Sequence, residues 1–511
     1  MKFISGFLCF SVFGLLLATS CAKEESESYD EFENMALQAW ITQHRPELIK
    51  NYQQDGGYYV DVIEAGKQDV APVSDTVCWV SFDFSGRDLA GNIILTRRAA
   101  EAKQIGKFTK YTHYVPFYRY CGEYNTSLPE GTYLAMRNTL HLDADYARER
   151  GLDTEIKLRE GSKVVLYLPS RVAGSLSGTG GYEGDSEFIM DGNHPIVMTV
   201  EIRDTVKNPL EREGTEVDTF CETAQNGGLK IYNDDEKDVT TTPLPTDPTD
   251  SKHPYNVSER WTSVNDTIPQ VYVNYRFDPA KDAISFPTPY ASLYEPYNNF
   301  AAMEEKINKA LAERFFPDED EPYKGVKELT DSVKLDGEAN IWYIARLLDG
   351  FVVDTNIDEV KEIVYGEVNA EGAAESYTPK EGGMITAWYY AVPHLKYGQW
   401  AALITTSTYA YGSSGVTGGV NTSTSSSGYS SSYLDYINAM SYANGYYGNS
   451  GYYGGYYDNY YGYGGYGNGY YDSYYGYDST DTDTSSESTV NTEIPPFTPL
   501  IFEIYVEPKE E

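Results

Sequence analysis

The sequence predicts an α+β fold class with two folded domains, and three features support this prediction. The length of 511 residues allows two to three domains, and a hydrophobic content of 41% is enough for buried cores. Residues 240–250 are rich in Thr, Pro and Asp, a composition typical of a linker between folded parts. Residues 339–355 alternate as strand, Asp-Gly turn and strand, which predicts a β-hairpin in the second part.

The N-terminus predicts a lipoprotein signal peptide over residues 1–21. Lys2 supplies a positive charge, residues 3–18 are almost wholly apolar, and the run ends at Cys21 in a sequence that resembles the bacterial lipobox. Cys21 is therefore the expected lipidation site, and acyl chains that contribute about 0.8 kcal/mol per buried methylene would anchor it. The expected location is the cell envelope, lipid-anchored at the outer membrane, with the face of that membrane left open.

Residues 22–50 are expected to form an acidic tether after the anchor. The segment from Ala22 to Glu27 resembles the export tag of some surface lipoproteins, and a plain solvated stalk is the alternative.

Charge and cysteine content exclude some classes of function. The formal net charge of −38 argues against nucleic-acid binding, because phosphates are bound by Lys and Arg. Beyond the signal peptide, Cys78, Cys121 and Cys221 are an odd set with no CxxC spacing, so neither a disulfide framework nor a metal site is expected. No cofactor is expected either.

Residues 207–325 are predicted to be a linker that contains one helix near residues 299–316. Apolar residues recur there at helical spacing, and Pro317 would end the helix. The residues on this apolar face are Phe300, Met303, Ile307, Leu311 and Phe315.

Residues 413–493 form a Tyr/Gly/Ser-rich insertion within the second domain, which spans residues 326–511. The tract has too few aliphatic residues for a core, so we expect it to be disordered. It contains Gly462, Gly464 and Gly467 in GxGxxG spacing, but a nucleotide site needs a strand before this motif and a helix after it. Flexible spacing between tyrosines is the better interpretation.

Motifs on both sides of the insertion resemble those of the FKBP family of peptidyl-prolyl cis-trans isomerases, in the family's order. They are the hairpin at 339–355, the sequence from Met384 to Trp388 at the start of a helix, the turn at 395–399, the Tyr409-Ala410-Tyr411-Gly412 signature and the proline-led closing strand at 494–504. The resemblance covers roughly 100 residues outside the insertion. It implies an antiparallel sheet wrapped around one short helix.

The resemblance also implies a site without metal or nucleophile. The catalytic set would be Asp354 as a buried carboxylate, Tyr411 as hydroxyl donor and Trp388 as floor under the prolyl ring. The substrate-binding set would be Tyr343, Val353, Ile385 and Phe502, with Ile385 offering its backbone N–H. Val353 departs from the family, which usually has Phe there, so a wider and less active site is expected. Except for Asp354 and Tyr411, these side chains could equally be core residues.

Residues 51–206 carry a fainter version of the same motifs and are predicted to be a degenerate FKBP-like domain. Its opening strand lies near residues 57–63, its closing strand near residues 195–201, and Phe84 stands at the wall position of the hairpin. Leu95 occupies the place of the family's Asp, and no Trp precedes Leu158, so this domain is expected to be inactive.

Three functions remain open from the sequence. The first is a peptidyl-prolyl isomerase of the cell envelope, whose partners would be proline-containing polypeptides of exported proteins and, through the anchor, the membrane. The second is a non-catalytic, chaperone-like binding lipoprotein that uses the fold and the Tyr-rich tract. The third is a structural part of an outer-membrane secretion or uptake assembly.

The lipidation prediction is tested by Cys21→Ser, which removes the thiol that would carry the lipid. We expect the variant to be released into soluble fractions or to remain unprocessed in cell fractionation. Unchanged membrane association would refute the lipoprotein assignment.

Overall fold

The computed structural model describes the chain in two compact units, and we treat each by itself. Unit 1 comprises residues up to 207 without 108–114, and unit 2 comprises residues 108–114 and 208–511. The described residues are 29–106, 108, 112–122, 128–173, 194–231, 257–264, 268–279, 283–286, 299–315, 331–366, 372–416 and 493–508. Cys21 and most of the predicted insertion, residues 417–492, lie outside them.

Unit 1 is built on an antiparallel sheet in which the last strand lies in the middle. The order is β1-β2-β8-β9-β3-β4, with β5 paired to one end of β3. The long central strand β9 pairs with β8 on one side and β3 on the other. The strands are β1 (Tyr52–Gln53), β2 (Tyr58–Ala65), β3 (Trp79–Arg87), β4 (Ile93–Thr96), β5 (Phe117–Tyr120), β8 (Ser162–Leu168) and β9 (Ile196–Val206), and β6 (Leu140–His141) pairs separately with β7 (Glu155–Ile156).

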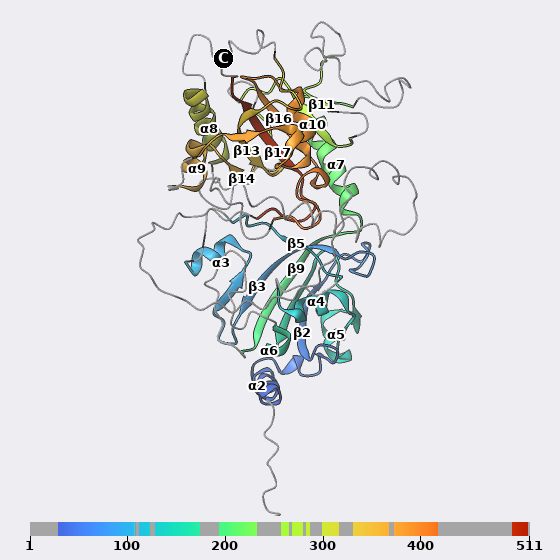
Figure 1. Cartoon of the computed structure of the whole chain (residues 1–511). Helices are drawn as coiled ribbons and strands as arrows, with labels where there is room; N and C mark the ends of the chain where they lie inside the picture. The colour runs from blue at the N-terminus through green and yellow to red at the C-terminus, as the bar shows by residue number, and fades with distance from the viewer. Residues whose placement is uncertain are drawn as a thin grey trace, which may run out of the picture. The chain divides into compact units, whose positions relative to one another are not determined.

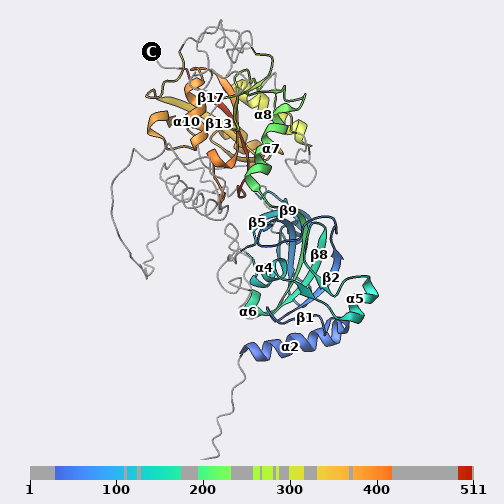
Figure 2. The ribbon, with the colours of Figure 1, turned by 90° about the vertical axis from the view of Figure 1, so that its right-hand side faces the viewer.

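The helices of unit 1 are short except for the first one. They are α2 (Tyr29–His44), α3 (Ala99–Gln104), α4 (Glu130–Arg137), α5 (Ala144–Arg150) and α6 (Ser170–Ala173), with the 3-10 turn η1 (Pro46–Leu48). Helix α2, labelled in Figure 2, corrects the predicted tether over residues 22–50. Its Leu37 and Ile41, one helical turn apart, are fully buried. The segment therefore belongs to the folded unit from residue 29 onward.

Unit 2 repeats the same strand order on a second sheet. The order is β10-β11-β12-β16-β17-β13-β14, with β15 paired to β13, and all pairings are antiparallel except that of β10 with β11 (Figure 1). The strands are β10 (Leu229–Lys230), β11 (Trp261–Ser263), β12 (Val271–Asn274), β13 (Ala339–Arg346), β14 (Val352–Thr355), β15 (Glu375–Tyr377), β16 (Trp400–Thr405) and β17 (Leu500–Val506). The predicted hairpin is confirmed as β13 and β14, and Gly350 in its turn has a φ of 88°.

The helices of unit 2 confirm two predictions. They are α7 (Pro209–Glu222), α8 (Phe300–Phe315), α9 (Asp358–Tyr365) and α10 (Thr386–Ala391), with 3-10 turns η4 (Pro379–Glu381), η5 (Val392–His394) and η6 (Ser407–Tyr409). Helix α8 buries Met303, Ile307 and Leu311, as its apolar periodicity predicted. Helix α10 is the short helix expected before the turn at 395–399.

The predicted linker over residues 207–325 is wrong for much of its length. Helix α7 and strands β10 to β12 lie in unit 2, and β12 pairs with β16 over four residues, Val271–Asn274. The strand is short, fully buried and lacks the alternation that marks a half-exposed strand, so sequence pattern alone did not reveal it. The second domain therefore begins near residue 208 rather than residue 326.

The two ends of the predicted insertion meet in an isolated bridge. Val416 N–H donates to the Ile494 carbonyl at 2.7 Å, and Ile494 N–H donates back at 3.1 Å. Ile494 is buried. These two hydrogen bonds join the described chain segments that flank the tract.

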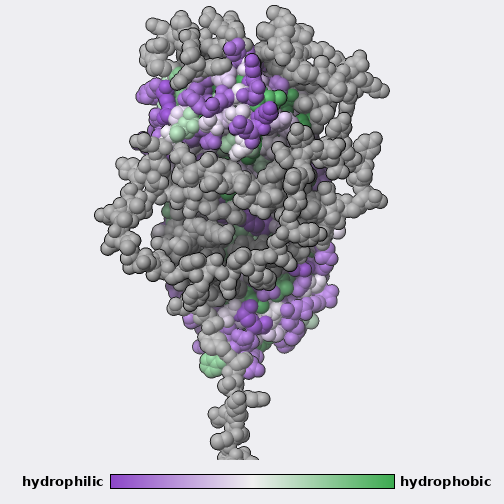
Figure 3. Space-filling model, in the orientation of Figure 1, coloured by the Kyte–Doolittle hydropathy of each residue, from purple (hydrophilic) through white to green (hydrophobic). Residues whose placement is uncertain are grey.

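Candidate membrane spans, metal clusters and disulfides are absent from the described residues. On the face drawn in Figure 3, the described residues at the surface are mainly hydrophilic. Within the described ranges no helix is long and apolar enough to cross a bilayer, and no cluster of acidic, His or Cys side chains could hold a metal ion. Cys78, Cys121 and Cys221 are buried free thiols.

The corrected boundary predicts how truncated chains behave. A chain of residues 326–511 lacks β11 and β12, so the buried strand β16 would become an unpaired edge. We expect residues 208–511 to give a protease-resistant product with a cooperative melting transition, and residues 326–511 to be degraded rapidly. Equal resistance of the two products in limited proteolysis would contradict the boundary.

Candidate functional site

A β-bulge at the β13–β14 hairpin places the acidic candidate of unit 2. Ala345 lies opposite Asp354, but the next residue, Arg346, lies opposite Val352, so Val353 is an extra residue in β14. A bulge of this kind bends the strand and redirects the neighbouring side chains. Val353 and Asp354 are both buried.

Asp354 is paired directly with the wall candidate Tyr343. The Tyr343 hydroxyl donates to Asp354 Oδ2 at 2.6 Å, across the hairpin from β13. Asp354 is 6% exposed, and burial of a carboxylate is costly unless it accepts hydrogen bonds. The hydroxyl of Tyr343 therefore both satisfies the carboxylate and fixes its direction.

The environment makes Asp354 a weaker acid than a free aspartate. Burial is the largest cause and raises its pKa to about 6, while the hydrogen bonds from Tyr343 and the Thr355 backbone and the charge of Lys361 act in the opposite direction. The carboxyl thus titrates near neutral pH instead of well below it.

Trp388 lies at the centre of an aromatic cluster. Its ring is edge-to-face with three others, at centroid distances of 5.5 Å to Tyr343, 5.6 Å to Tyr377 and 5.8 Å to Phe502. This geometry is the favourable one for aromatic pairs. Trp388 is 0% exposed, and its indole N–H has no hydrogen-bond partner in the described part of the chain.

Tyr377 is the member of this cluster that sequence reasoning missed. It lies on β15, which pairs with β13 at Ala339. The only available signal would have been its position in a short strand after a helix, and the chain has 49 tyrosines. The sequence therefore offered no means to single it out.

Ile385 stands at the start of helix α10, before the first helical residue. Its carbonyl accepts from Trp388 N–H at 3.0 Å, which begins the helix and orients the indole. Its own backbone N–H has no acceptor among the described residues, as is usual for an N-terminal helix position. This N–H is available to an incoming carbonyl once the side chains around it allow access.

Tyr411 lies in the turn that follows β16 and is half-buried. The turn is closed by Gly412 N–H, which donates to the Ser407 carbonyl at 2.8 Å, and by Phe497 N–H, which donates to the Gly412 carbonyl at 3.0 Å. The structure thus brings Tyr343, Asp354, Trp388 and Phe502 into one cluster, while Tyr411 occupies a turn at the end of β16.

The two units match in register across their sheets. In both, a bulge lies at the same place in the hairpin, after Gly86 in β3 and after Ala345 in β13. The row of paired residues beside the bulge is Val60, Leu166, Met198, Gly86 and Leu95 in unit 1, and Val273, Leu403, Phe502, Ala345 and Asp354 in unit 2.

This match places apolar residues of unit 1 at the positions of three candidates of unit 2. Leu95 stands at the register position of Asp354, which confirms the sequence alignment, and Met198 stands at that of Phe502. Phe84, two residues before Gly86, takes the place of Tyr343 and has no hydroxyl to donate. Unit 1 thus has the frame of the site without its polar pair.

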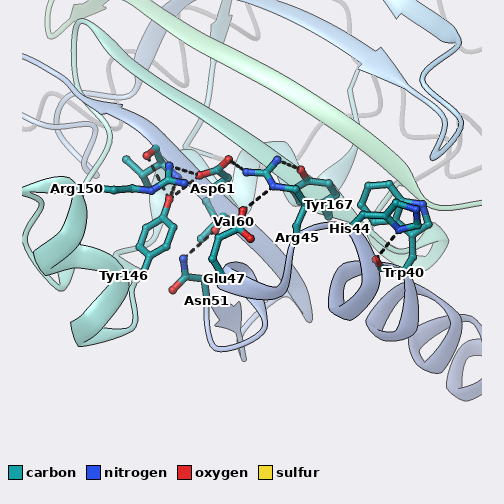
Figure 4. A network of polar contacts seen from close by, with 11 residues as sticks. Trp40, His44, Arg45, Glu47, Asn51, Val60, Asp61, Tyr146, Arg150 and Tyr167 are labelled. Atoms are coloured by element: carbon teal, nitrogen blue, oxygen red, sulfur yellow. Dashed lines mark hydrogen bonds and ion pairs between the residues drawn. The ribbon is translucent and has the colours of Figure 1, made fainter.

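Unit 1 instead carries a buried carboxylate on β2. Asp61 accepts from Tyr146 at 2.6 Å and from Arg150 at 2.8 Å and is ion-paired with Arg45, which also donates to Tyr167 (Figure 4). These partners come from α5, β8 and the segment after α2. The network ties these elements to the sheet, and its carboxylate is saturated, so it is a structural pair and not a counterpart of Asp354.

Comparison with known proteins finds structural neighbours only. No family model and no curated protein matches the sequence. A structure of three FKBP domains of wheat FKBP73 has 10% identity and a TM-score of 0.19, and the match covers 89% of this chain and 95% of that one. FkpA from Escherichia coli has 15% identity and a TM-score of 0.21, with 40% and 72% covered. A peptidyl-prolyl isomerase from Pseudomonas syringae has 18% identity and a TM-score of 0.20, with 34% and 94% covered.

These TM-scores are too low for the likeness to carry an argument by itself. The interpretation of the site therefore rests on strand order, register and side-chain contacts within this chain.

The raised pKa of Asp354 predicts a pH-dependent stability. Its contribution is fully present below the unfolded value near 3.8 and is lost as pH rises through about 6, because the fold favours the protonated form. Asp354→Asn keeps an acceptor for Tyr343 but cannot titrate. Relative to this variant, the wild type should lose up to about 3 kcal/mol of unfolding free energy between pH 4 and pH 7.

The measurement is the unfolding midpoint of both proteins by calorimetry at each pH. A wild-type-to-variant difference that stays constant with pH would contradict a titrating Asp354.

Proposed function

We propose that unit 2 is an FKBP-type peptidyl-prolyl cis-trans isomerase and that unit 1 has the same fold without activity. The observation that carries the proposal is the Tyr343–Asp354 hydrogen bond beside the Trp388 cluster, set at a hairpin bulge that unit 1 shares without the polar pair. The strand order of both units, with the closing strand in the middle and a short helix after the hairpin, supports the fold assignment.

The proposed reaction needs no covalent intermediate. Rotation about an Xaa-Pro bond breaks amide resonance, with a barrier of about 18–20 kcal/mol, and takes tens of seconds uncatalysed. Turnover in milliseconds requires a reduction of roughly 5–6 kcal/mol. An apolar environment that disfavours the charge-separated planar amide, together with a positioned donor, supplies interactions that are stronger in the twisted state.

Each residue has a definite part in this proposal. Trp388 and Phe502 form the apolar surface for the prolyl ring, and Ile385 N–H and the Tyr411 hydroxyl donate to substrate carbonyls. The Tyr343 hydroxyl holds the Asp354 carboxylate so that its negative charge faces the Xaa-Pro amide. Val353 contributes a smaller wall than the Phe that the family usually has at this position.

The buried state of Trp388 sets a condition for activity. Since the indole is 0% exposed, a prolyl ring reaches it only after a covering side chain moves. The rings of Tyr343, Tyr377 and Phe502 that pack against the indole are themselves buried, so this opening is a step of the proposed reaction.

The location and substrates belong to the same proposal. The predicted lipidated Cys21 would hold the protein in the cell envelope, where its substrates would be proline-containing segments of exported polypeptides. The calculated net charge of −38 makes nucleic acid an unsuitable partner.

A second candidate is a non-catalytic, chaperone-like binding lipoprotein. The closed aromatic cluster and the smaller Val353 favour it, because a fold can bind extended peptide at its surface without opening a prolyl site. Activity measurements decide between the two.

The isomerase proposal predicts graded losses of rate in the full-length protein. Wild type should accelerate cis-trans exchange of Xaa-Pro peptides in exchange NMR. Tyr411→Phe removes one hydrogen bond and should lower kcat/KM by about 3- to 10-fold. Trp388→Ala should abolish most activity, partly through a packing loss of about 3–5 kcal/mol, and Asp354→Val should slow exchange without unfolding.

The matched control is Leu95→Val, which changes the register partner of Asp354 in unit 1 and should leave the rate unchanged. A wild-type protein that is inert towards several Xaa-Pro peptides and still binds unfolded polypeptide would refute the isomerase proposal in favour of the second candidate.

A further inference from the structure

A buried glutamate outside the sheet, Glu213, accepts two hydrogen bonds from the turn that contains Tyr411. Glu213 on helix α7 is 1% exposed, and its two carboxylate oxygens accept separately from Ser407. The Ser407 backbone N–H donates to Oε2 at 3.0 Å, and its hydroxyl donates to Oε1 at 2.8 Å. The two residues are 194 positions apart in the chain.

Ser407 is the residue from which the turn starts. It opens η6 directly after β16, and its carbonyl accepts from Gly412 N–H at 2.8 Å, so Ser407 and Gly412 close a loop that contains Tyr411. Holding Ser407 on both its N–H and its hydroxyl therefore limits how the backbone of this loop can shift.

The position of Glu213 is energetically expensive for a carboxylate. Burial raises its pKa to about 7, against the lowering effect of the two Ser407 contacts. A buried carboxylate is tolerated when hydrogen bonds compensate its desolvation, and here the described donors both belong to Ser407. The pair thus couples α7 specifically to this turn.

Unit 1 contains the same arrangement. Glu33 on α2 accepts from the Ser170 backbone N–H at 2.8 Å, and also from the Ser170 hydroxyl. Ser170 follows Leu166 by four residues, as Ser407 follows Leu403, and these two leucines share a register position in the matched sheets.

The helices that carry the two glutamates match as well. Each glutamate is followed after four and eight residues by buried apolar positions that hold the helix in place. These positions are Leu37 and Ile41 in α2, and Val217 and Cys221 in α7. The turn held by Glu33 leads to Val172 and Ala173, whereas the turn held by Glu213 leads to Tyr411.

We propose that Glu213 is a positioning residue for the isomerisation: by holding Ser407 on helix α7, it fixes the turn that presents the Tyr411 hydroxyl to substrate. The inference rests on the proposed isomerase function of unit 2. Helix α7 thereby becomes part of the proposed catalytic domain, although it contains none of the FKBP-like motifs.

The experiment uses the full-length protein and measures kcat/KM for an Xaa-Pro peptide by exchange NMR. Glu213→Ala leaves both Ser407 donors without acceptor and should lower kcat/KM by about 5- to 10-fold, the loss of Tyr411 positioning. Glu213→Gln keeps one carbonyl acceptor and should recover part of that loss. The double variant Glu213→Ala with Tyr411→Phe should lose no more than Tyr411→Phe alone, because both act through the same hydroxyl.

The matched control is Glu33→Ala, which breaks the same contact in unit 1. It should keep kcat/KM within about twofold of wild type, since the turn it releases carries no tyrosine. Should Glu213→Ala fail to fold, Ser407→Ala removes only the hydroxyl donor, keeps the N–H contact and replaces it in each comparison.

Three results would overturn the inference. Wild-type kcat/KM in a folded Glu213 or Ser407 variant would remove the positioning role. If the losses of kcat/KM from Glu213→Ala and Tyr411→Phe were additive, or if Glu33→Ala lost as much as Glu213→Ala, the Glu213–Ser407 contact would only stabilise its unit in general. A wild type without any activity would refute the proposed function itself, and the positioning role with it, which separates that failure from the others.

Discussion

The constraint on which both units depend is the pairing of the last strand in the middle of the sheet. Strand β17 pairs with β16 on one side and β13 on the other, and every one of its residues is buried. Its backbone N–H and C=O groups must therefore find partners from segments far away in sequence. Because its register is set on both sides, it aligns Phe502 with Ala345, and through the hairpin with Asp354. The bulge, the aromatic cluster and the turn after β16 all take their positions from this alignment.

Unit 2 buries three carboxylates against different kinds of hydrogen-bond donor. Unit 2 buries Asp354 against Tyr343, Glu213 against Ser407, and Glu503 against Arg346, whose guanidinium also pairs with Glu304. The last of these is a structural ion pair that fastens α8 to the sheet. Burial raises the pKa of all three carboxyl groups, that of Glu503 in spite of the Arg346 guanidinium beside it.

The two units share one strand order, so comparing them separates features of the fold from features of the proposed site. Each unit has a sheet of the same strand order and a bulged hairpin, so these features report the fold and not the chemistry. What unit 2 adds on this common frame is the hydroxyl of Tyr343, the carboxylate of Asp354, the indole of Trp388 and the turn with Tyr411. The proposed isomerase activity comes from these additions.

The sequence by itself determined the local elements and nominated the candidate site residues. The Asp-Gly turn fixed the hairpin, helical spacing fixed α8, and the order of motifs placed Asp354, Trp388 and Phe502, because each depends on neighbouring residues or on a known pattern. Only the tertiary structure showed that β12 pairs with β16 in the sheet of unit 2, that α2 packs on the core of unit 1, that Tyr377 contacts Trp388, and that Glu213 holds Ser407. These contacts join residues up to 194 positions apart, and short, fully buried or isolated residues carry no periodic signal of their partners.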